Sequence, residues 1–342
     1  MGIFKKIKYQ NGRRHIYFCN IKIFSYQSKK KQSVVIRNFD VTPLGKIYKP
    51  YYNPVSPLLP TEHDIYNSDG QKMRTFFIRD VHLACEPANE SKYLIWDRFN
   101  FGLKTHFYSH NSMLETMGNP DKRYGFLIET EAIVPDDYNI FERNPGLYKD
   151  FDMIFTHSDR ILSSVPNARF VPMCASLYGG TFAPVNQWKK KNRNVSILSS
   201  AKLMCDLHRY RFDLAQKCKE NGWADTFGTF DGGSLVPIDD TLRDYRYSFC
   251  IENSITPYLF TERLICAFAN QTVPIYLGAS QIDKFFNPDG IIKITPGSDI
   301  EAVLKQCTPE EYLRRKDAIL DNYERAKEYA NPWDYMYTHY LQ

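Results

Sequence analysis

The stretch of sequence that decides the fold is CIENSITPYLFTERLICAFANQTVPIYLG, residues 250–278. It begins with the end of an apolar run that closes at Ile251, and the polar residues Glu252-Asn253-Ser254 follow. We expect a helix over residues 261–270, because Thr261 is a favourable N-cap residue. Residues 273–277 (VPIYL) then read as a second strand. A strand, a loop, a helix and another strand in this order form the repeating unit of a parallel α/β sheet.

The polar residues around this helix N-terminus have the chemistry of an anion site. Unpaired backbone N–H groups and the positive end of the helix dipole attract negative groups at such a position. Arg263 can pair with a phosphate, and Glu262 can accept hydrogen bonds from two hydroxyl groups, such as those of a ribose. Taken singly, these residues are better explained as a strand-end turn and a capped surface helix. Their ordered combination favours a binding site.

The same alternation of short apolar runs with helical segments extends through most of the chain. A second long helix is predicted over residues 205–221, with apolar side chains on one face. The candidate strands are residues 76–78, 93–96, 125–128, 153–156, 169–172, 195–198, 226–228, 247–251 and 273–277. They fall into two consecutive series, which predict two Rossmann-like domains.

The boundary between the two series falls near residues 173–194. We therefore divide the chain into a basic N-terminal segment with a linker (1–72), a first Rossmann-like domain (73–175) and a second Rossmann-like domain with C-terminal helices (176–342). Within the N-terminal segment, residues 15–24 read as one strand. Ligands usually bind in the cleft between two domains of this kind.

Composition and charge exclude several classes of protein. No run of about 18 apolar residues is present, so we expect no membrane-spanning helix, and the polar N-terminus predicts no signal peptide. The eight cysteines form no C-x-x-C pair, which argues against a zinc ribbon and indicates reduced, mostly buried thiols of a cytosolic protein. The net charge of +5 is uneven, because residues 1–50 hold twelve Lys or Arg and one acid, Asp40. This segment is either a solvated flank or a contact with an anionic membrane surface.

The stretch 250–278 resembles the signature of the α-1,3-fucosyltransferases of glycosyltransferase family ten. That signature reads roughly Phe-Glu-Asn-Ser, a spacer, Tyr-x-Thr-Glu-Lys, then a helix and Val-Pro-(Val/Ile)-x-x-Gly. This chain offers Glu252-Asn253-Ser254, Thr261-Glu262-Arg263 and Val273-Pro274-Ile275-Tyr276-Leu277-Gly278. Two positions differ: Arg263 replaces the family's Lys, and Tyr258 lies one place before the position of the family's Tyr.

The resemblance implies a GT-B fold, in which two Rossmann-like domains face each other across a cleft. It implies that the first domain (73–175) binds the acceptor and that the second (176–342) binds the nucleotide sugar. It implies an inverting transfer of fucose from GDP-fucose to a hydroxyl group of a glycan acceptor. The donor-binding residues that it implies are Arg211, Glu252, Asn253, Tyr258, Glu262 and Arg263. Arg211, in the sequence His208-Arg209-Tyr210-Arg211, corresponds to an arginine that binds the donor pyrophosphate. We expect no obligatory metal or other cofactor, since the two arginines and a helix N-terminus would neutralise the leaving diphosphate.

An inverting transfer also needs a carboxylate that removes the proton of the attacking hydroxyl. The family has the order Gly-Glu-x-x-x-Pro at a strand end, and its Glu is the proposed base. This chain reads IETEAIVP over residues 128–135, so the resemblance assigns the base to Glu131, four residues before Pro135. Glu129 is a close alternative. Both residues can also be explained, without a catalytic role, as ordinary acids at the edge of a strand.

Two other patterns raise the alternative of a metal site. Asp150-Phe151-Asp152 matches the Asp-x-Asp string of metal-dependent glycosyltransferases, and His106 and His110 form one H-x-x-x-H. The Asp-x-Asp string leads directly into a candidate strand, and no Glu follows the first His as a zincin motif requires. We therefore predict no metal site.

The combined prediction is a cytoplasmic fucosyltransferase of bacterial surface polysaccharide synthesis. Its basic N-terminus is either a solvated flank or a peripheral contact with the inner membrane surface. Its partners would be a nucleotide sugar and a glycan acceptor, with no nucleic acid. One alternative is a transferase of the same fold that uses another nucleotide sugar. The other is a non-enzymatic protein that binds anionic surfaces or nucleic acid through residues 1–50.

Overall fold

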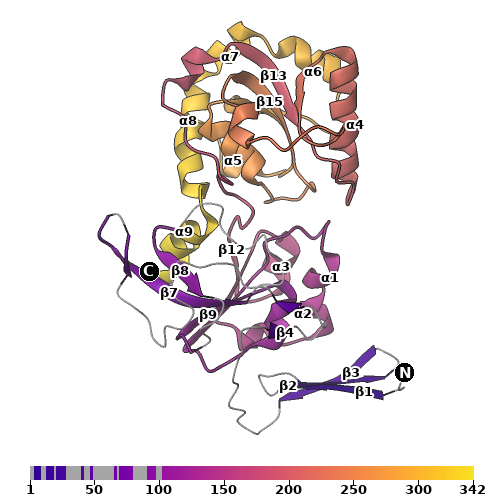
Figure 1. Cartoon of the computed structure of the whole chain (residues 1–342), viewed down its shortest axis with the longest axis vertical. Helices are drawn as coiled ribbons and strands as arrows, with labels where there is room; N and C mark the ends of the chain where they lie inside the picture. Colours follow the sequence, from indigo (N-terminus) through magenta and orange to yellow (C-terminus); the bar gives the residue numbers. More distant parts are fainter. Residues whose placement is uncertain are drawn as a thin grey trace. The chain divides into compact units, whose positions relative to one another are not determined.

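The computed structural model describes residues 4–8, 13–18, 21–27, 40–41, 47–48, 65–67, 69–79, 91–97 and 102–342. The chain divides into two compact units (Figure 1). Unit 1 contains residues 1–85, 92–127 and 137–155, and unit 2 contains residues 86–91, 128–136 and 156–342. Unit 2 thus takes in residues 128–136 and 156–175, which the sequence analysis places in the first domain. The domain boundaries at residues 72 and 175 stay predictions.

Unit 2 contains a five-stranded sheet in the order β14-β13-β15-β16-β17. All four strand pairings are parallel, for example Val195 opposite Tyr247 and Phe249 opposite Ile275. The strands are β13 (Arg193–Leu198), β14 (Asp225–Phe227), β15 (Tyr245–Ile251), β16 (Val273–Leu277) and β17 (Ile292–Lys293). The main helices are α4 (Asp206–Asn221), α5 (Glu262–Ala269), α6 (Ile300–Gln306), α7 (Pro309–Arg314), α8 (Lys316–Ala326) and α9 (Pro332–Met336).

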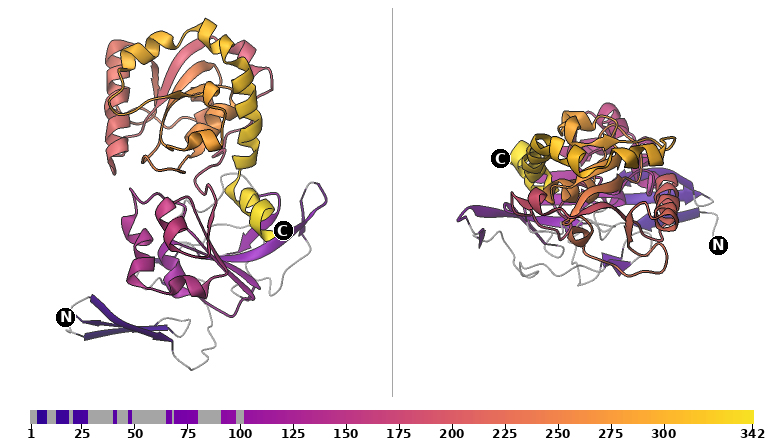
Figure 2. Two further views of the ribbon diagram at one scale, coloured as in Figure 1. Left: turned by 180° about the vertical axis from the view of Figure 1, so that it is seen from behind. Right: turned by 90° about the horizontal axis from the view of Figure 1, so that it is seen from above.

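The direction of winding reverses between β13 and β15. The chain passes from β13 through α4 to β14 on one side, and from β15 through α5 to β16 on the other. Because crossovers between parallel strands are right-handed, helices that move in opposite directions cover opposite faces of the sheet. Figures 1 and 2 show α4 on one side of the strands and α5 with α8 on the other. This doubly wound arrangement places a topological switch point between β13 and β15.

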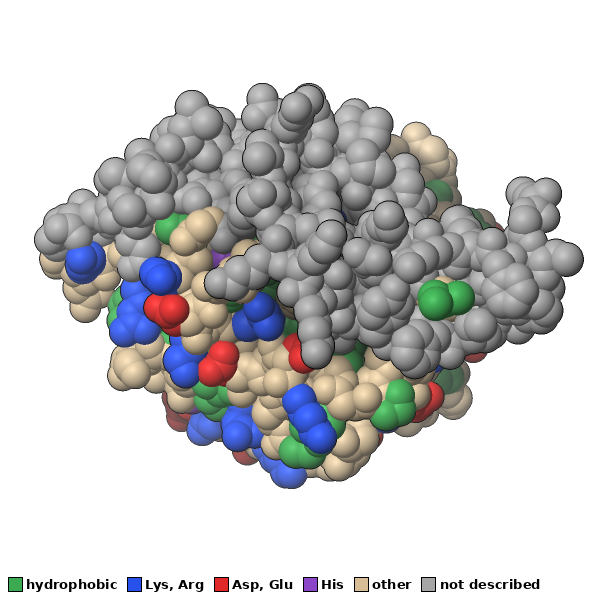
Figure 3. All heavy atoms as spheres, turned by 90° about the horizontal axis from the view of Figure 1, so that it is seen from below, with side chains coloured by type: hydrophobic (Ala, Val, Ile, Leu, Met, Phe, Trp, Pro, Cys, Tyr) green, Lys and Arg blue, Asp and Glu red, His purple; other side chains and the backbone are tan. Residues whose placement is uncertain are grey.

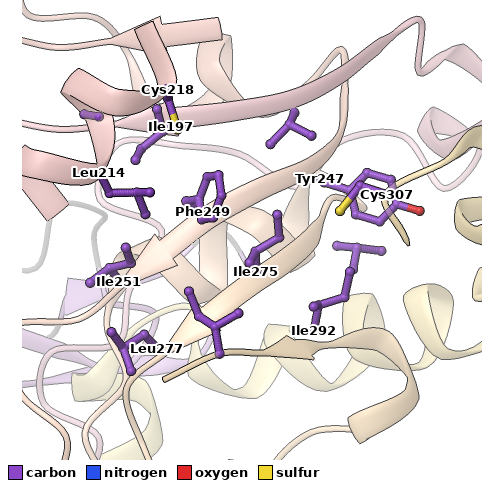
Figure 4. Close-up of a cluster of buried hydrophobic side chains, with 14 of the residues drawn as sticks. Ile197, Leu214, Cys218, Tyr247, Phe249, Ile251, Ile275, Leu277, Ile292 and Cys307 are labelled. Carbon is purple, nitrogen blue, oxygen red and sulfur yellow. The ribbon is translucent and has the colours of Figure 1, made fainter. Parts of the chain in front are cut away.

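Apolar side chains of this sheet, of α4 and of residues 307–319 form a buried cluster in unit 2 (Figure 4). Alternate residues of a strand point to the same face, so Tyr247, Phe249 and Ile251 of β15 all enter this cluster. Leu214 and Cys218, four residues apart, contribute the facing stripe of α4. Burial of each large apolar side chain contributes about 1.5–3 kcal/mol. The core therefore holds the carboxyl ends of β13 and β15 in fixed positions.

Unit 1 is built on a second, mainly parallel sheet. Its strands are β6 (Ile65–Tyr66), β7 (Lys72–Arg79), β8 (Leu94–Asp97), β9 (Thr105–Ser109), β10 (Lys122–Phe126) and β11 (Met153–Thr156), and the sheet continues to β12 (Ala168–Phe170). Strands β7, β8, β9, β10 and β11 pair in parallel, whereas β6 is antiparallel to β7. Short helices follow the strands: α1 (Pro135–Tyr138), α2 (Ile140–Arg143) and α3 (Asp159–Ser164).

The remaining elements belong to the N-terminal segment. Strands β1 (Phe4–Lys8), β2 (Arg13–Phe18) and β3 (Ile21–Gln27) form an antiparallel sheet, and β4 (Asp40–Val41) pairs with β5 (Ile47–Tyr48). The prediction of one strand over residues 15–24 is wrong, because the chain reverses between Phe18 and Ile21, which are paired with each other. A membrane contact of the basic residues 1–50 concerns side chains outside the described part of the chain.

The two parallel-sheet α/β units confirm the predicted pair of Rossmann-like domains of the GT-B fold class. The sequence analysis missed β9, which occupies a central position between β7 and β10. Its polar residues His106 and Tyr108 are fully buried and hydrogen-bond to each other at 2.8 Å, so the strand shows no alternation of apolar and polar residues.

The surface of the described residues carries both signs of charge. In the view of Figure 3, Lys and Arg side chains are interspersed with Asp and Glu, and apolar side chains are scattered between them. Among the described residues, no helix is both long and apolar enough to cross a bilayer.

Candidate active site

The carboxyl ends of β13 and β15 bring together most of the predicted donor-binding residues. In an open α/β sheet, ligands bind in the crevice at the switch point, beyond the carboxyl ends of the strands. Residues 199–205 leave β13 and lead into α4, while residues 252–261 leave β15 and lead into α5. The thiol of Cys205 donates a hydrogen bond to the carbonyl of Asn253 at 3.2 Å and links the two loops. Arg211, Asn253, Glu252, Glu262 and Arg263 all lie on these loops or on the helices that they open.

Arg211 is a buried cation on α4. Its side chain is 2% exposed, and its Nη1 donates to the carbonyl of Ile251 at 2.7 Å. Within the described residues its Nε has no hydrogen-bond partner, and no carboxylate forms an ion pair with it. Burial, followed by the nearby charge of Arg263, lowers its pKa to about 9. A buried guanidinium without a carboxylate partner gains most from a negatively charged ligand.

Arg263 lies in the first turn of α5. Thr261 caps this helix, with its Oγ1 accepting from the N–H of Arg263 at 3.3 Å. The Nη1 of Arg263 lies 3.0 Å from the Oε1 of Glu262, and both side chains are about a quarter exposed. Burial opposes the charge of Arg263, but the carboxylates of Glu262 and Glu252 outweigh it and raise the pKa of this arginine. Arg263 therefore stays a cation, and a ligand can reach the Glu262–Arg263 pair.

Glu252 serves the fold. Its side chain is fully buried, and its two carboxylate oxygens accept from the N–H of Thr261 at 3.0 Å and from the Oγ1 of Thr261 at 2.7 Å. Burial, assisted by repulsion from Glu262, raises its pKa to about 7. Glu252 thus ties the end of β15 to the start of α5. Its predicted contact with a donor stays a prediction and would require one of these hydrogen bonds to change.

Asn253 is held by a histidine that the sequence analysis did not select. The Oδ1 of Asn253 lies 2.8 Å from the Nε2 of His208, and the Nδ1 of His208 lies 3.3 Å from the backbone nitrogen of Met204. His208 is 5% exposed. The signal was present in the sequence, because His208 and Arg211 are three residues apart and therefore share one face of α4.

Tyr258 lies apart from these contacts. Its ring centroid is 5.8 Å from that of Phe170 and 6.4 Å from that of Phe285, and the Nζ of Lys284 lies 5.8 Å from the ring centroid. The structure therefore places Tyr258 in an aromatic cluster. Its predicted role in donor binding stays a prediction.

The two candidate bases lie in the turn that follows β10. The carbonyl of Thr130 accepts from the N–H groups of Ile133 and Val134, which closes this turn. Glu131 projects a carboxylate that is 41% exposed and lies 2.6 Å from the Nη2 of Arg160, at the start of α3. The carboxylate of Glu129 accepts from the N–H of Thr130 at 2.8 Å. Its charge contributes to the raised pKa of Arg263.

The residues of the two metal-like patterns are occupied by other contacts. Asp152 accepts from the Nζ of Lys122 and the backbone N–H of Arg123, both at 2.9 Å. His106 lies in β9, and His110 lies 3.2 Å from Asp137 at the start of a 3-10 helix, so the pair does not share one helix face. Among the described residues, no three His, Cys, Asp or Glu side chains gather in a metal-like group.

Unit 2 is a doubly wound α/β unit with cationic groups at its switch point, the position where open α/β sheets bind their ligands. Residues 188–331 match the family model described as "Glycosyltransferase family 10 (fucosyltransferase) C-term". This match agrees with the resemblance of the 250–278 stretch to the α-1,3-fucosyltransferases of glycosyltransferase family ten.

Sequence identity to individual proteins is low. The α-(1,3)-fucosyltransferase FucT of Helicobacter pylori is 28% identical over 91 residues, which are 26% of this chain and 18% of the relative's length. A crystal structure of an α1,3-fucosyltransferase with GDP is 13% identical, with a TM-score of 0.45 over 78% of this chain and 84% of that one. The Anabaena protein Alr3699/HepE, in complex with UDP and glucose, is 11% identical, with a TM-score of 0.47 over 70% of this chain and 77% of that one.

Proposed function

We propose that this protein is an inverting fucosyltransferase that moves fucose from GDP-fucose to a hydroxyl group of a glycan. The observation that carries the proposal is the buried, carboxylate-free Arg211 beside Arg263 at the switch point of the second sheet. Two cations at this place fit the diphosphate of a nucleotide sugar. The match of residues 188–331 to the fucosyltransferase family model supports fucose as the transferred sugar.

In this proposal the arginines act on the leaving group. When the bond between the sugar and the diphosphate breaks, negative charge accumulates on the diphosphate, and nearby fixed cations stabilise that charge. The N-terminus of α4 adds unpaired N–H groups, because no side chain caps it. With two guanidinium groups and a helix N-terminus available, we propose that the transfer needs no metal ion.

The base of the reaction is proposed to be Glu131. Its carboxylate is partly exposed, so an acceptor hydroxyl can reach it, and the ion pair with Arg160 fixes its position. Glu129 is the alternative, supported by its electrostatic influence on Arg263. Either carboxylate would take the hydroxyl proton while the hydroxyl oxygen attacks the anomeric carbon opposite the leaving diphosphate.

The Helicobacter pylori relative is a bacterial fucosyltransferase, which supports a bacterial glycan as the acceptor. We further propose synthesis of surface polysaccharide in the cytoplasm as the setting. A transferase of the same fold with another nucleotide sugar is the main alternative.

A transfer assay tests the proposal. Purified protein is incubated without metal with GDP-fucose or, in parallel, with UDP-sugars and a panel of glycan acceptors, and the configuration of the product is read by NMR. We expect release of GDP and a product whose anomeric configuration is inverted relative to the donor. Transfer from UDP-sugars only, or retention of configuration, would contradict it.

A further inference from the structure

We propose that His208 is a positioning residue, which orients the side-chain amide of Asn253 so that its NH2 group faces the nucleotide-sugar donor. The inference rests on the proposed function, because it assigns a task within that donor site. It concerns a residue that touches Asn253 and not the donor itself, so its role is to set the direction of a hydrogen-bond donor.

The protonation of His208 follows from its two neighbours. The backbone N–H of Met204 can only donate, so the Nδ1 of His208 must accept this hydrogen bond. In the neutral imidazole the proton then resides on Nε2, which donates to the Oδ1 of Asn253 at 2.8 Å. Burial lowers the pKa of His208, and the cations Arg211, Arg263 and Lys202 act in the same direction. His208 is therefore neutral at pH 7, in the tautomer that these contacts require.

The orientation of Asn253 follows from that tautomer. A side-chain amide can flip and exchange the positions of its oxygen and nitrogen. The Nε2–H of His208 is a hydrogen-bond donor, so it is compatible only with the orientation that presents Oδ1 to it. The NH2 group is then directed away from His208, and within the described residues it makes no hydrogen bond. The backbone of Asn253 is held as well, through its carbonyl and the thiol of Cys205. A fixed NH2 group two residues after Ile251, whose carbonyl accepts from Arg211, suits an oxygen acceptor, either of a phosphate or of a ribose.

The two hydrogen bonds of His208 can be separated by substitution. A glutamine places an amide nitrogen near the position of Nε2, so His208→Gln keeps a donor for Asn253. An asparagine places its amide oxygen near the position of Nδ1, so His208→Asn keeps an acceptor for Met204 and loses the contact with Asn253. Arg209→Ala is the matched control on the same turn, because Arg209 is 61% exposed and pairs with Asp206.

The test measures the GDP dissociation constant by calorimetry and the KM for GDP-fucose by initial rates, with thermal unfolding as a check on folding. We expect His208→Asn to weaken GDP binding and to raise the KM about tenfold, as the loss of one well-placed hydrogen bond predicts. His208→Gln and Arg209→Ala should stay within about threefold of wild type.

Three outcomes decide the matter. Rescue of GDP binding by Gln but not by Asn supports the positioning role. Equal losses in both His208 variants, or no loss in either, overturn it and leave the proposed function intact when the wild type binds GDP. If the wild type binds no nucleotide at all, the proposed function fails first, and the inference fails with it.

Discussion

The loop after β15 and the turn after β10 were both expected to carry function, and they differ in what their acids do. In the loop, Glu252 is fully buried, and both of its oxygens accept from Thr261. In the turn, Glu131 is 41% exposed and forms an ion pair with Arg160. The first acid builds the site, whereas the second is accessible to a substrate.

One sequence signature can thus contain residues that stabilise the fold and residues that are available to a ligand. Glu252 follows the end of a strand and closes the start of α5 by hydrogen bonds with Thr261, so it would be needed for the fold even without a ligand. The side chains of Arg211 and Arg263 suit an anion. Four predictions test this difference between the buried Glu252, the accessible Glu131 and the two arginines, from the largest expected effect to the smallest.

The largest expected effect is that of Glu131→Gln on turnover. Removing the proposed base should lower kcat by about 10²–10⁴-fold, the usual contribution of general base catalysis, and leave GDP affinity unchanged. Steady-state rates with GDP-fucose and a calorimetric titration measure the two quantities. Glu129→Gln is the matched control. If Glu129→Gln abolishes turnover while Glu131→Gln is active, the base is Glu129.

The second prediction concerns Glu252 and the pH dependence of stability. The pKa of Glu252 is about 7 in the folded protein against an ordinary value of 4.5, so the folded state binds this proton more tightly. The contribution of Glu252 to the free energy of unfolding should therefore be largest at acidic pH. It should fall as the pH rises from 4.5 to 7. The expected loss is about 2–4 kcal/mol.

Denaturant titrations of wild type and Glu252→Gln at several pH values measure this loss. The Gln variant cannot titrate at this position, so its free energy of unfolding should change less over the same range. If the free energy of unfolding depends on pH in the same way in both proteins, Glu252 has its ordinary pKa in the folded state, and the prediction is wrong.

The third prediction concerns the buried cation. Arg211→Lys keeps a charge but cannot reproduce both the hydrogen bond to Ile251 and a bidentate contact with a phosphate. We expect GDP binding to weaken about 10–100-fold, measured by calorimetry. Arg209→Ala, at an exposed position two residues earlier on α4, should bind GDP like wild type. An Arg211→Lys variant with unchanged affinity would remove this residue from the donor site.

The smallest effect is expected for Arg263→Lys. This substitution restores the residue type of the family signature and keeps the charge next to Glu262. Because the position is partly exposed, the change in GDP affinity should stay within about threefold. A loss of tenfold or more would mean that the guanidinium geometry of Arg263 is used in this chain.

Much of the fold was accessible from the sequence, for physical reasons. The β15–α5–β16 segment is predictable because its strands are continuous apolar runs and Thr261 marks the helix start. Strand β9 was missed because burial on both faces removes the alternation that marks a strand, and its buried polar pair His106 and Tyr108 resembles a surface sequence. The reversal after Phe18 was missed because no local turn motif in the sequence predicts the antiparallel pairing of β2 with β3.

The candidate site was predictable only in part. Arg263 was selected from its position at a helix start and Arg211 from the resemblance to the family, and the structure places both at the switch point. The role of Glu252 depends on a buried hydrogen-bond pair, and that of His208 on a contact 45 residues away in sequence. Spacing alone does not show contacts of this kind.

The most direct test of the account is a calorimetric titration of the purified protein with GDP, UDP and ADP, first without metal and then with a divalent cation. The account predicts that GDP binds in preference to UDP and ADP, and that the metal does not change its affinity. Absence of nucleotide binding, or a preference for UDP or ADP, would contradict the assignment of this switch point as a GDP-fucose site.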